Sequence, residues 1–167
     1  LDDFRRKSRD IPCVSFFSGC GGLDLGFEAA GFGHALLVDN NQIFCDTLRL
    51  NRTAWNVAGP PVSSGNVSNL EELTNVIRNE LGSTKTFDGV FLGGPPCQPF
   101  SIAANQRFNK SGKNFKRVGF SHEVNGNLLF DYIHYIIEFR PRVFLIENVT
   151  GLKDIDGGEQ LSSAIGL

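Results

Sequence analysis

The chain has 167 residues, 41% of them apolar, and a formal net charge of −2. This length and apolar content suit a single domain. The net charge does not mark the whole chain as a basic nucleic-acid binder. No apolar run approaches the roughly 20 residues of a membrane span. The four cysteines show no CxxC or CxxH spacing, so we expect no metal site. Without an export signal we expect reduced thiols, in bacterial cytoplasm near the nucleoid or in a eukaryotic nucleus.

Short apolar runs alternate with helical patterns along the chain. Strands are predicted at 13–17, 34–39, 88–93 and 142–147, with a loop or short strand between 53 and 65. Helices are predicted at 23–31, 41–51, 69–82 and 127–141, the third of them capped by Ser68 or Asn69. This alternation predicts one Rossmann-like α/β domain over 1–167, with a doubly wound, mostly parallel sheet and helices on both faces.

The first strand leads into a glycine turn, FSGCGGLDLG at 17–26. Its glycines either leave backbone amides open to a ligand at a helix N-terminus or allow tight packing, and the spacing leaves both readings open. It is not the GxGxxG of a dinucleotide site, which counts against an NAD-dependent oxidoreductase. Asp39 ends the next strand, where an acidic residue about 20 positions after such a turn commonly bonds ribose hydroxyls. Capping of the helix 41–51 is its alternative role.

A cysteine framed by prolines follows the third strand, in GGPPCQPFS at 93–101. The prolines fix the backbone on both sides of Cys97, at the strand end where open α/β sheets place their chemistry. Glu147 ends the next strand, in the sequence ENV. Alone, Glu147 suits an ion pair or a cap at a strand end. Together with Cys97 on the neighbouring strand end, it suggests a nucleophile and an acid facing one cleft.

Residues 102–126 carry no sustained apolar period, and we expect a mobile basic loop there. Five cations against Glu123 give this segment a net charge of +4, which leaves −6 on the rest of the chain. A solvated surface loop is the alternative, but the position beside Cys97 favours contact with a polyanion. The five cations are Arg107, Lys110, Lys113, Lys116 and Arg117.

Three motifs, FSGCGGLDLGFEAAGF, GGPPCQPFS and ENV, resemble the cytosine-C5 DNA methyltransferase family in their order and at their strand ends. The resemblance runs from about 14 to 149 and implies that S-adenosylmethionine is the cofactor and DNA the partner. It implies a methionine-binding turn at 17–23, a ribose contact at Asp39 and a methionine-lining segment at 127–128. The implied cofactor contacts are Phe17, Ser18, Gly19, Cys20, Gly21, Gly22, Leu23, Asp39, Asn40, Ile43, Asn66, Val67, Pro95, Asn127 and Leu128.

Two of these positions depart from the family's pattern. Asn40 stands where an aromatic residue often lies over the adenine, so Ile43 is expected to cover that ring instead. Asn66, in GNV, replaces an aspartate that reads the adenine amino group. Its amide oxygen is still able to accept that hydrogen bond.

The reaction is also implied by the resemblance. The Cys97 thiolate would add to C6 of a cytosine flipped out of the duplex, and Glu147 would protonate or hydrogen-bond N3. The basic loop would close over the base, with Gln98 and Ser101 contacting the strand at the entrance.

Some family motifs do not occur in these 167 residues. There is no QxRxR segment, target-recognition region or closing GNxV segment, so we expect a C-terminal region or subunit as partner, and no activity from this chain alone. Three alternatives stay open: the same chemistry on tRNA, a non-catalytic cofactor-binding subunit of a split or truncated enzyme, and the NAD-dependent oxidoreductase.

Overall fold

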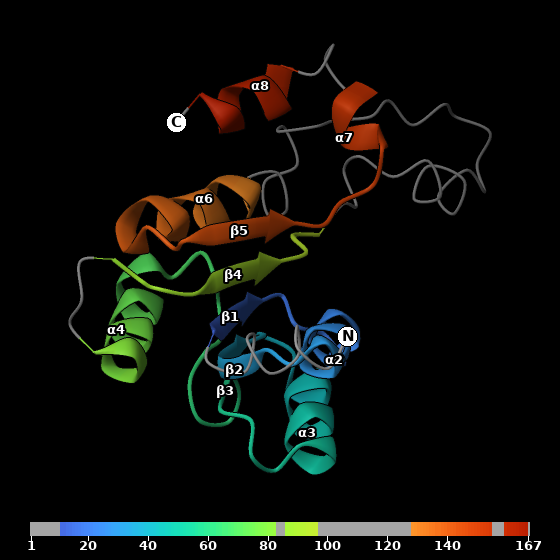
Figure 1. The fold of residues 1–167 in the computed structure, drawn as a ribbon, viewed down its shortest axis with the longest axis vertical. Helices are drawn as coiled ribbons and strands as arrows, with labels where there is room; N and C mark the ends of the chain where they lie inside the picture. The colour runs from blue at the N-terminus through green and yellow to red at the C-terminus, as the bar shows by residue number, and fades with distance from the viewer. Residues whose placement is uncertain (1–10, 83–85, 97–127, 155–158, 167) are drawn as a thin grey trace, which may run out of the picture.

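The computed structural model describes residues 11–82, 86–96, 128–154 and 159–166. Within them, five parallel strands form one sheet in the order β3-β2-β1-β4-β5 (Figure 1). The strands are β1 (Pro12–Phe16), β2 (Gly33–Val38), β3 (Val57–Ala58), β4 (Val90–Gly93) and β5 (Val143–Ile146). The helices are α2 (Gly22–Ala30), α3 (Gln42–Asn51), α4 (Leu70–Leu81), α6 (Leu128–Phe139), α7 (Gly151–Asp154) and α8 (Glu159–Ile165). The predicted α/β fold with its parallel sheet is confirmed.

The helix ends follow from local chemistry, with one correction to the predicted caps. Helix α2 ends where Gly31 takes a left-handed φ of 100°, as a C-terminal glycine does. Helix α3 is capped by Asn41, whose side chain accepts hydrogen bonds from the amides of Ile43 and Phe44. The capping role considered for Asp39 is therefore wrong. Helix α4 has its N-cap at Asn69, one of the two predicted positions, although the Asn69 side chain makes no cap hydrogen bond. The Ser68 hydroxyl donates to Asp131 of α6 instead.

Helices cover both faces of the sheet, which confirms the doubly wound arrangement. On one face α4 and α6 pack on the central strands, and on the other α2 packs on β1 and β4 while α3 packs on β2 and β3. Figure 1 shows α4 on the left of the sheet and α2 and α3 on its right. The β-α alternation therefore predicted the layers as well as the strands.

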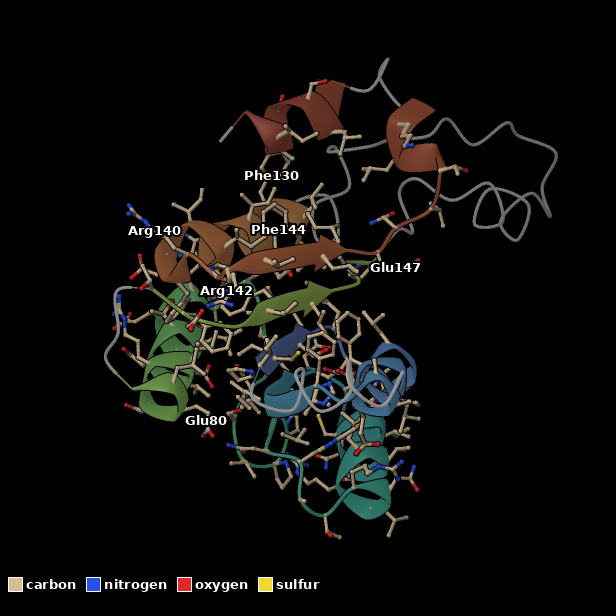
Figure 2. The ribbon with its side chains drawn as sticks, in the orientation of Figure 1. Glu80, Phe130, Arg140, Arg142, Phe144 and Glu147 are labelled. Carbon is tan, nitrogen blue, oxygen red and sulfur yellow. The ribbon has the colours of Figure 1, made fainter. Side chains whose placement is uncertain are left out.

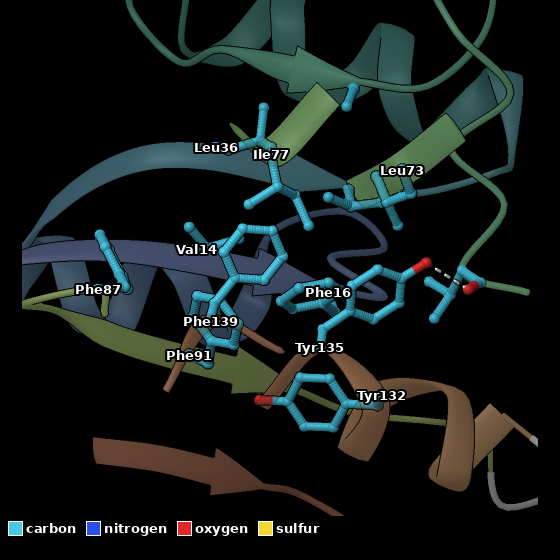
Figure 3. Close-up of a cluster of buried hydrophobic side chains, with 13 residues drawn as sticks. Val14, Phe16, Leu36, Leu73, Ile77, Phe87, Phe91, Tyr132, Tyr135 and Phe139 are labelled. Atoms are coloured by element: carbon cyan, nitrogen blue, oxygen red, sulfur yellow. Dashed lines mark hydrogen bonds between the residues drawn. The ribbon is translucent and has the colours of Figure 1, made fainter. Parts of the chain in front are cut away.

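The main core is an aromatic cluster between the sheet, α4 and α6 (Figure 3). The Phe16 ring lies 5.2 Å from that of Phe91, 5.0 Å from that of Tyr132 and 5.3 Å from that of Tyr135, all in tilted arrangements. Tilted ring pairs at such distances add to the stabilisation from buried area alone. The buried Tyr135 hydroxyl donates to the carbonyl of Val67 at 2.8 Å, so the core also holds the segment before α4.

Helices α7 and α8 lie beyond β5 and were not predicted from the sequence. A small apolar cluster joins them to α6 through Leu129, Ile133 and Leu152, with Leu161 and Ala164 packed against it. Both helices are short, and the pattern of such short segments is weak. None of the helices in the described ranges has the length and apolar content needed to cross a membrane.

Candidate active site

Three strand ends meet at one edge of the sheet. Phe16 of β1 lies in register with Val38 of β2 on one side and with Gly93 of β4 on the other. The residues that follow these strands therefore emerge together, as the carboxyl ends of parallel strands must. Phe17, the first of them, has a positive φ of 57°, a strained conformation for a side chain of its size.

Asp39 ties the glycine turn to the end of β2. One carboxylate oxygen accepts from the Gly19 amide at 2.8 Å and the other from the Asn41 amide at 2.8 Å. The residue is only 8% exposed. Each carboxylate oxygen keeps a further lone pair, so Asp39 is able to hold the turn and accept a ligand hydroxyl at the same time.

Some glycines of the turn pack closely against other residues, and others leave free space beside the backbone. Gly21 has a left-handed φ of 84°, and a Cβ on it would lie 2.9 Å from the Leu48 side chain and 3.3 Å from the Trp55 ring, so backbone conformation and close packing both favour glycine here. Cβ atoms on Gly19 and Gly22 would meet nothing within 4 Å. The turn therefore presents open backbone at these two positions, at the entry to α2.

Three other residues of the turn have different surroundings. Ser18 is buried and its hydroxyl donates to the Ser15 carbonyl at 3.3 Å, while Cys20 is exposed. Leu23 packs on the apolar cluster beneath α2 that contains Val90 and Leu92. Leu23 therefore belongs to the core face of α2 and is not placed toward the strand-end pocket.

A pocket of about 200 Å³ opens at the strand ends. It combines an aromatic ring, a carboxylate, an amide and apolar surface, which together suit a nucleoside. It does not include Ile43, which is 73% exposed on α3, or Pro95, which is buried. Gly65 and Pro96 were not predicted, although both border predicted residues in the sequence. The lining residues are Phe17, Asp39, Asn40, Gly65, Asn66, Val67, Pro96 and Leu128.

The segment 59–67 carries one wall of this pocket. Gly65 has a φ of 59°, and a Cβ built on it would overlap the Asp39 carbonyl oxygen, so only glycine fits. The Ser64 hydroxyl and amide both donate to the Glu72 carboxylate, at 2.6 and 2.9 Å. The hydrogen bonds from Ser64 lower the pKa of Glu72, so this anchor stays ionised at neutral pH. The Asn66 side-chain oxygen accepts from the Ser68 amide at 3.1 Å, which uses one of its lone pairs.

Glu147 lies at the same edge, beside the end of β4 (Figure 2). Its amide donates to the Gly93 carbonyl at 2.8 Å, and a Cβ on Gly94 would lie 3.4 Å from its carboxylate. The Asn148 side chain donates to the Pro95 carbonyl at 3.1 Å and so ties the ENV segment to the proline-rich segment. Within the described ranges Glu147 has no cation partner, so the ion-pair alternative finds no support there.

Several predicted residues lie outside the described residues, in the segment between Pro96 and α6. They are Cys97, Gln98, Ser101, the basic loop 102–126 and Asn127. Two described cysteines are poorly reactive. The pKa of Cys13 is raised to about 12, mainly because the thiol is buried and to a smaller extent because the Asp24 carboxylate is near. Burial, and then Asp39, also raise the pKa of Cys45. Both therefore remain thiols near neutral pH and are poor nucleophiles.

The parallel sheet, the glycine turn, the acidic strand end and the nucleoside-sized pocket agree with the α/β fold of S-adenosylmethionine-dependent methyltransferases, to which the similar solved structures belong. A crystal structure named as a "putative DNA modification methyltransferase" encoded within an E. coli prophage matches 94% of this chain, and the match covers 37% of that protein, with a TM-score of 0.64 and 25% identity. The family model for C-5 cytosine-specific DNA methylase matches residues 11–166. The chain belongs to this family.

Curated relatives agree with this membership. The chain is 37% identical to the Type II methyltransferase M.PspPI of Psychrobacter sp. (strain TA137), over 95% of this chain and 32% of the relative. It is 33% identical to the Type II methyltransferase M.AquIA of Picosynechococcus sp., over 90% of this chain and 53% of the relative. The chain thus spans from about a third to about half of the length of these two relatives.

Proposed function

We propose that this chain supplies the cofactor-binding and catalytic part of an enzyme that methylates C5 of cytosine in DNA. The observation that carries the proposal is the shared strand-end edge, where the nucleoside-sized pocket lies near Glu147 and the segment leading to Cys97. The residues present suit S-adenosylmethionine: Asp39 for ribose hydroxyls, Phe17 for apolar contact, and the open space beside Gly22 at the N-terminus of α2 for the methionine part. This cofactor would supply a methyl group on a sulfonium, which is electrophilic.

Cytosine C5 is a weak nucleophile, and the proposed residues would overcome this. The Cys97 thiolate would form a bond to C6, which gives C5 the reactivity of an enamine carbon. Glu147 would donate a proton or a strong hydrogen bond at N3 and so favour this addition. After methyl transfer, loss of the C5 proton and cleavage of the bond between sulfur and C6 would release the base and the thiolate.

Cofactor preference gives a first test of this function. We expect the protein to bind S-adenosylmethionine and S-adenosylhomocysteine and to show no binding of NAD at millimolar concentration, because the glycine turn lacks the spacing of a dinucleotide site. Isothermal titration with the three ligands measures this directly. Binding of NAD in preference to the other two would refute the proposed function.

The substitution Asn66→Asp is expected to tighten cofactor binding about tenfold, or about 1.4 kcal/mol. The Asn66 oxygen already accepts from the Ser68 amide, so only one lone pair on that oxygen is left to accept from a ligand. A carboxylate would keep the bond to Ser68 and offer a second acceptor to the adenine amino group. The test is titration with S-adenosylhomocysteine. Asn79→Asp, at an exposed position on α4, makes the same charge change away from the pocket and should leave affinity unchanged.

A further inference from the structure

Arg49 on α3 holds the segment that forms the wall of the pocket, without being part of the pocket. Its guanidinium donates three hydrogen bonds to backbone carbonyls: to Pro60 at 2.6 Å, to Gly59 at 2.9 Å and to Val57 at 3.1 Å. The side chain is 27% exposed, and Asp46 lies 3.5 Å from it. A planar guanidinium presents its donors in a rigid fork, a geometry that the ammonium group of a lysine cannot reproduce.

The segment 59–67 returns on itself directly over Asp39. A Cβ on either Gly59 or Gly65 would overlap the Asp39 carbonyl oxygen. The two glycines, near the start and the end of the segment, therefore both pack against this one backbone atom. Glu72 and Tyr135 hold its outgoing end, through Ser64 and Val67. Arg49 is the described side chain that holds its incoming end, at Gly59 and Pro60.

We propose that Arg49 is a positioning residue for the nucleoside half of the pocket. By fixing Gly59 and Pro60, it sets where Gly65 and Asn66 lie relative to Asp39, and so sets the spacing between the base contact and the ribose contact. The methionine half depends on the glycine turn, which Asp39 holds through Gly19. This inference rests on the proposed function, because it assumes that the pocket takes an adenine nucleoside.

The test compares Arg49→Gln and Arg49→Lys with the unchanged 167-residue chain, by titration with S-adenosylhomocysteine at low temperature. We expect about tenfold weaker binding for glutamine and an intermediate loss for lysine, which keeps a charge but not the three-carbonyl geometry. Circular dichroism confirms that each variant is folded. If the Arg49→Gln variant does not fold, the affinity of the Arg49→Lys variant for S-adenosylhomocysteine tests the proposal. Arg52→Gln is the matched control, because Arg52 bonds Glu28 of α2 and not this segment.

Coupling to Asn66 separates positioning from a merely stabilising role. If Arg49 positions Asn66, the affinity gained by Asn66→Asp should fall to less than threefold in the Arg49→Gln background, because neighbours in one network are not additive. Unchanged affinity in the folded Arg49 variants, or a full gain from Asn66→Asp in the Arg49→Gln background, would overturn the inference. Failure of the unchanged protein to bind S-adenosylhomocysteine would instead refute the proposed function.

Discussion

Replacing Cys97 by alanine in the complete enzyme is expected to lower methyl transfer by at least about 10⁴-fold, while the affinity for S-adenosylmethionine stays within about twofold. The loss is this large because no other group would activate C5 once the addition to C6 is removed. The affinity is preserved because Cys97 is not among the described residues that line the pocket, such as Phe17, Asp39 and Leu128. Transfer of a labelled methyl group to DNA, with cofactor titration in parallel, measures both quantities.

A mechanism-based substrate identifies the nucleophile directly. DNA carrying 5-fluorocytosine should trap a covalent adduct, since the fluorine cannot leave as a proton does, and peptide mapping should place the adduct on Cys97. Cys20→Ala is a suitable control because Cys20 is exposed in the glycine turn, whereas Cys13 and Cys45 are buried. Normal turnover by the Cys97→Ala variant would show that the nucleophile is assigned wrongly.

The 167-residue chain by itself is expected to bind cofactor and to leave DNA unmethylated. Phosphate contacts carry no sequence information, and no target-recognition region was found in this sequence. The structure adds a second reason at β5, which pairs with β4 and with no other strand among the described residues. Phe144 on this strand is 52% exposed, and the nearby Val143, Ile137 and Ile165 are also exposed. Apolar side chains gathered at a strand edge are typical of a surface that further polypeptide covers.

The decisive assay uses labelled cofactor and DNA, with the chain alone and mixed with a polypeptide that supplies the rest of a family catalytic domain. Activity only in the mixture is the expected result, and Cys97→Ala in this chain should abolish that activity. Site-specific methylation by the chain alone would contradict the prediction. A mixture that binds tightly but stays inactive with the native Cys97 would favour the non-catalytic alternative.

Local periodicity in the sequence predicted the layers and the four longer strands, and the resemblance of three motifs indicated the family. Strands such as 34–39 and helices such as 69–82 carry their periodicity locally, and their observed bounds, Gly33–Val38 and Leu70–Leu81, differ by one residue at each end. The glycine turn and GGPPCQPFS are likewise local, because glycine and proline restrict the backbone wherever they occur. The local sequence could therefore indicate which strand ends carry the candidate cofactor-binding and catalytic residues.

Only the tertiary structure showed which hydrogen bonds the side chains at those strand ends make, and with which partners. Asp39 was expected to bond ribose, to cap α3, or to do both, but its carboxylate holds Gly19 and Asn41 while Asn41 caps the helix. The bonds from Asn148 to Pro95 and from Tyr135 to Val67 join residues 53 and 68 positions apart. Such partners depend on strand register and helix packing, which are set by the whole core. Local periodicity carries no information about them, because it reports only which face of an element is apolar.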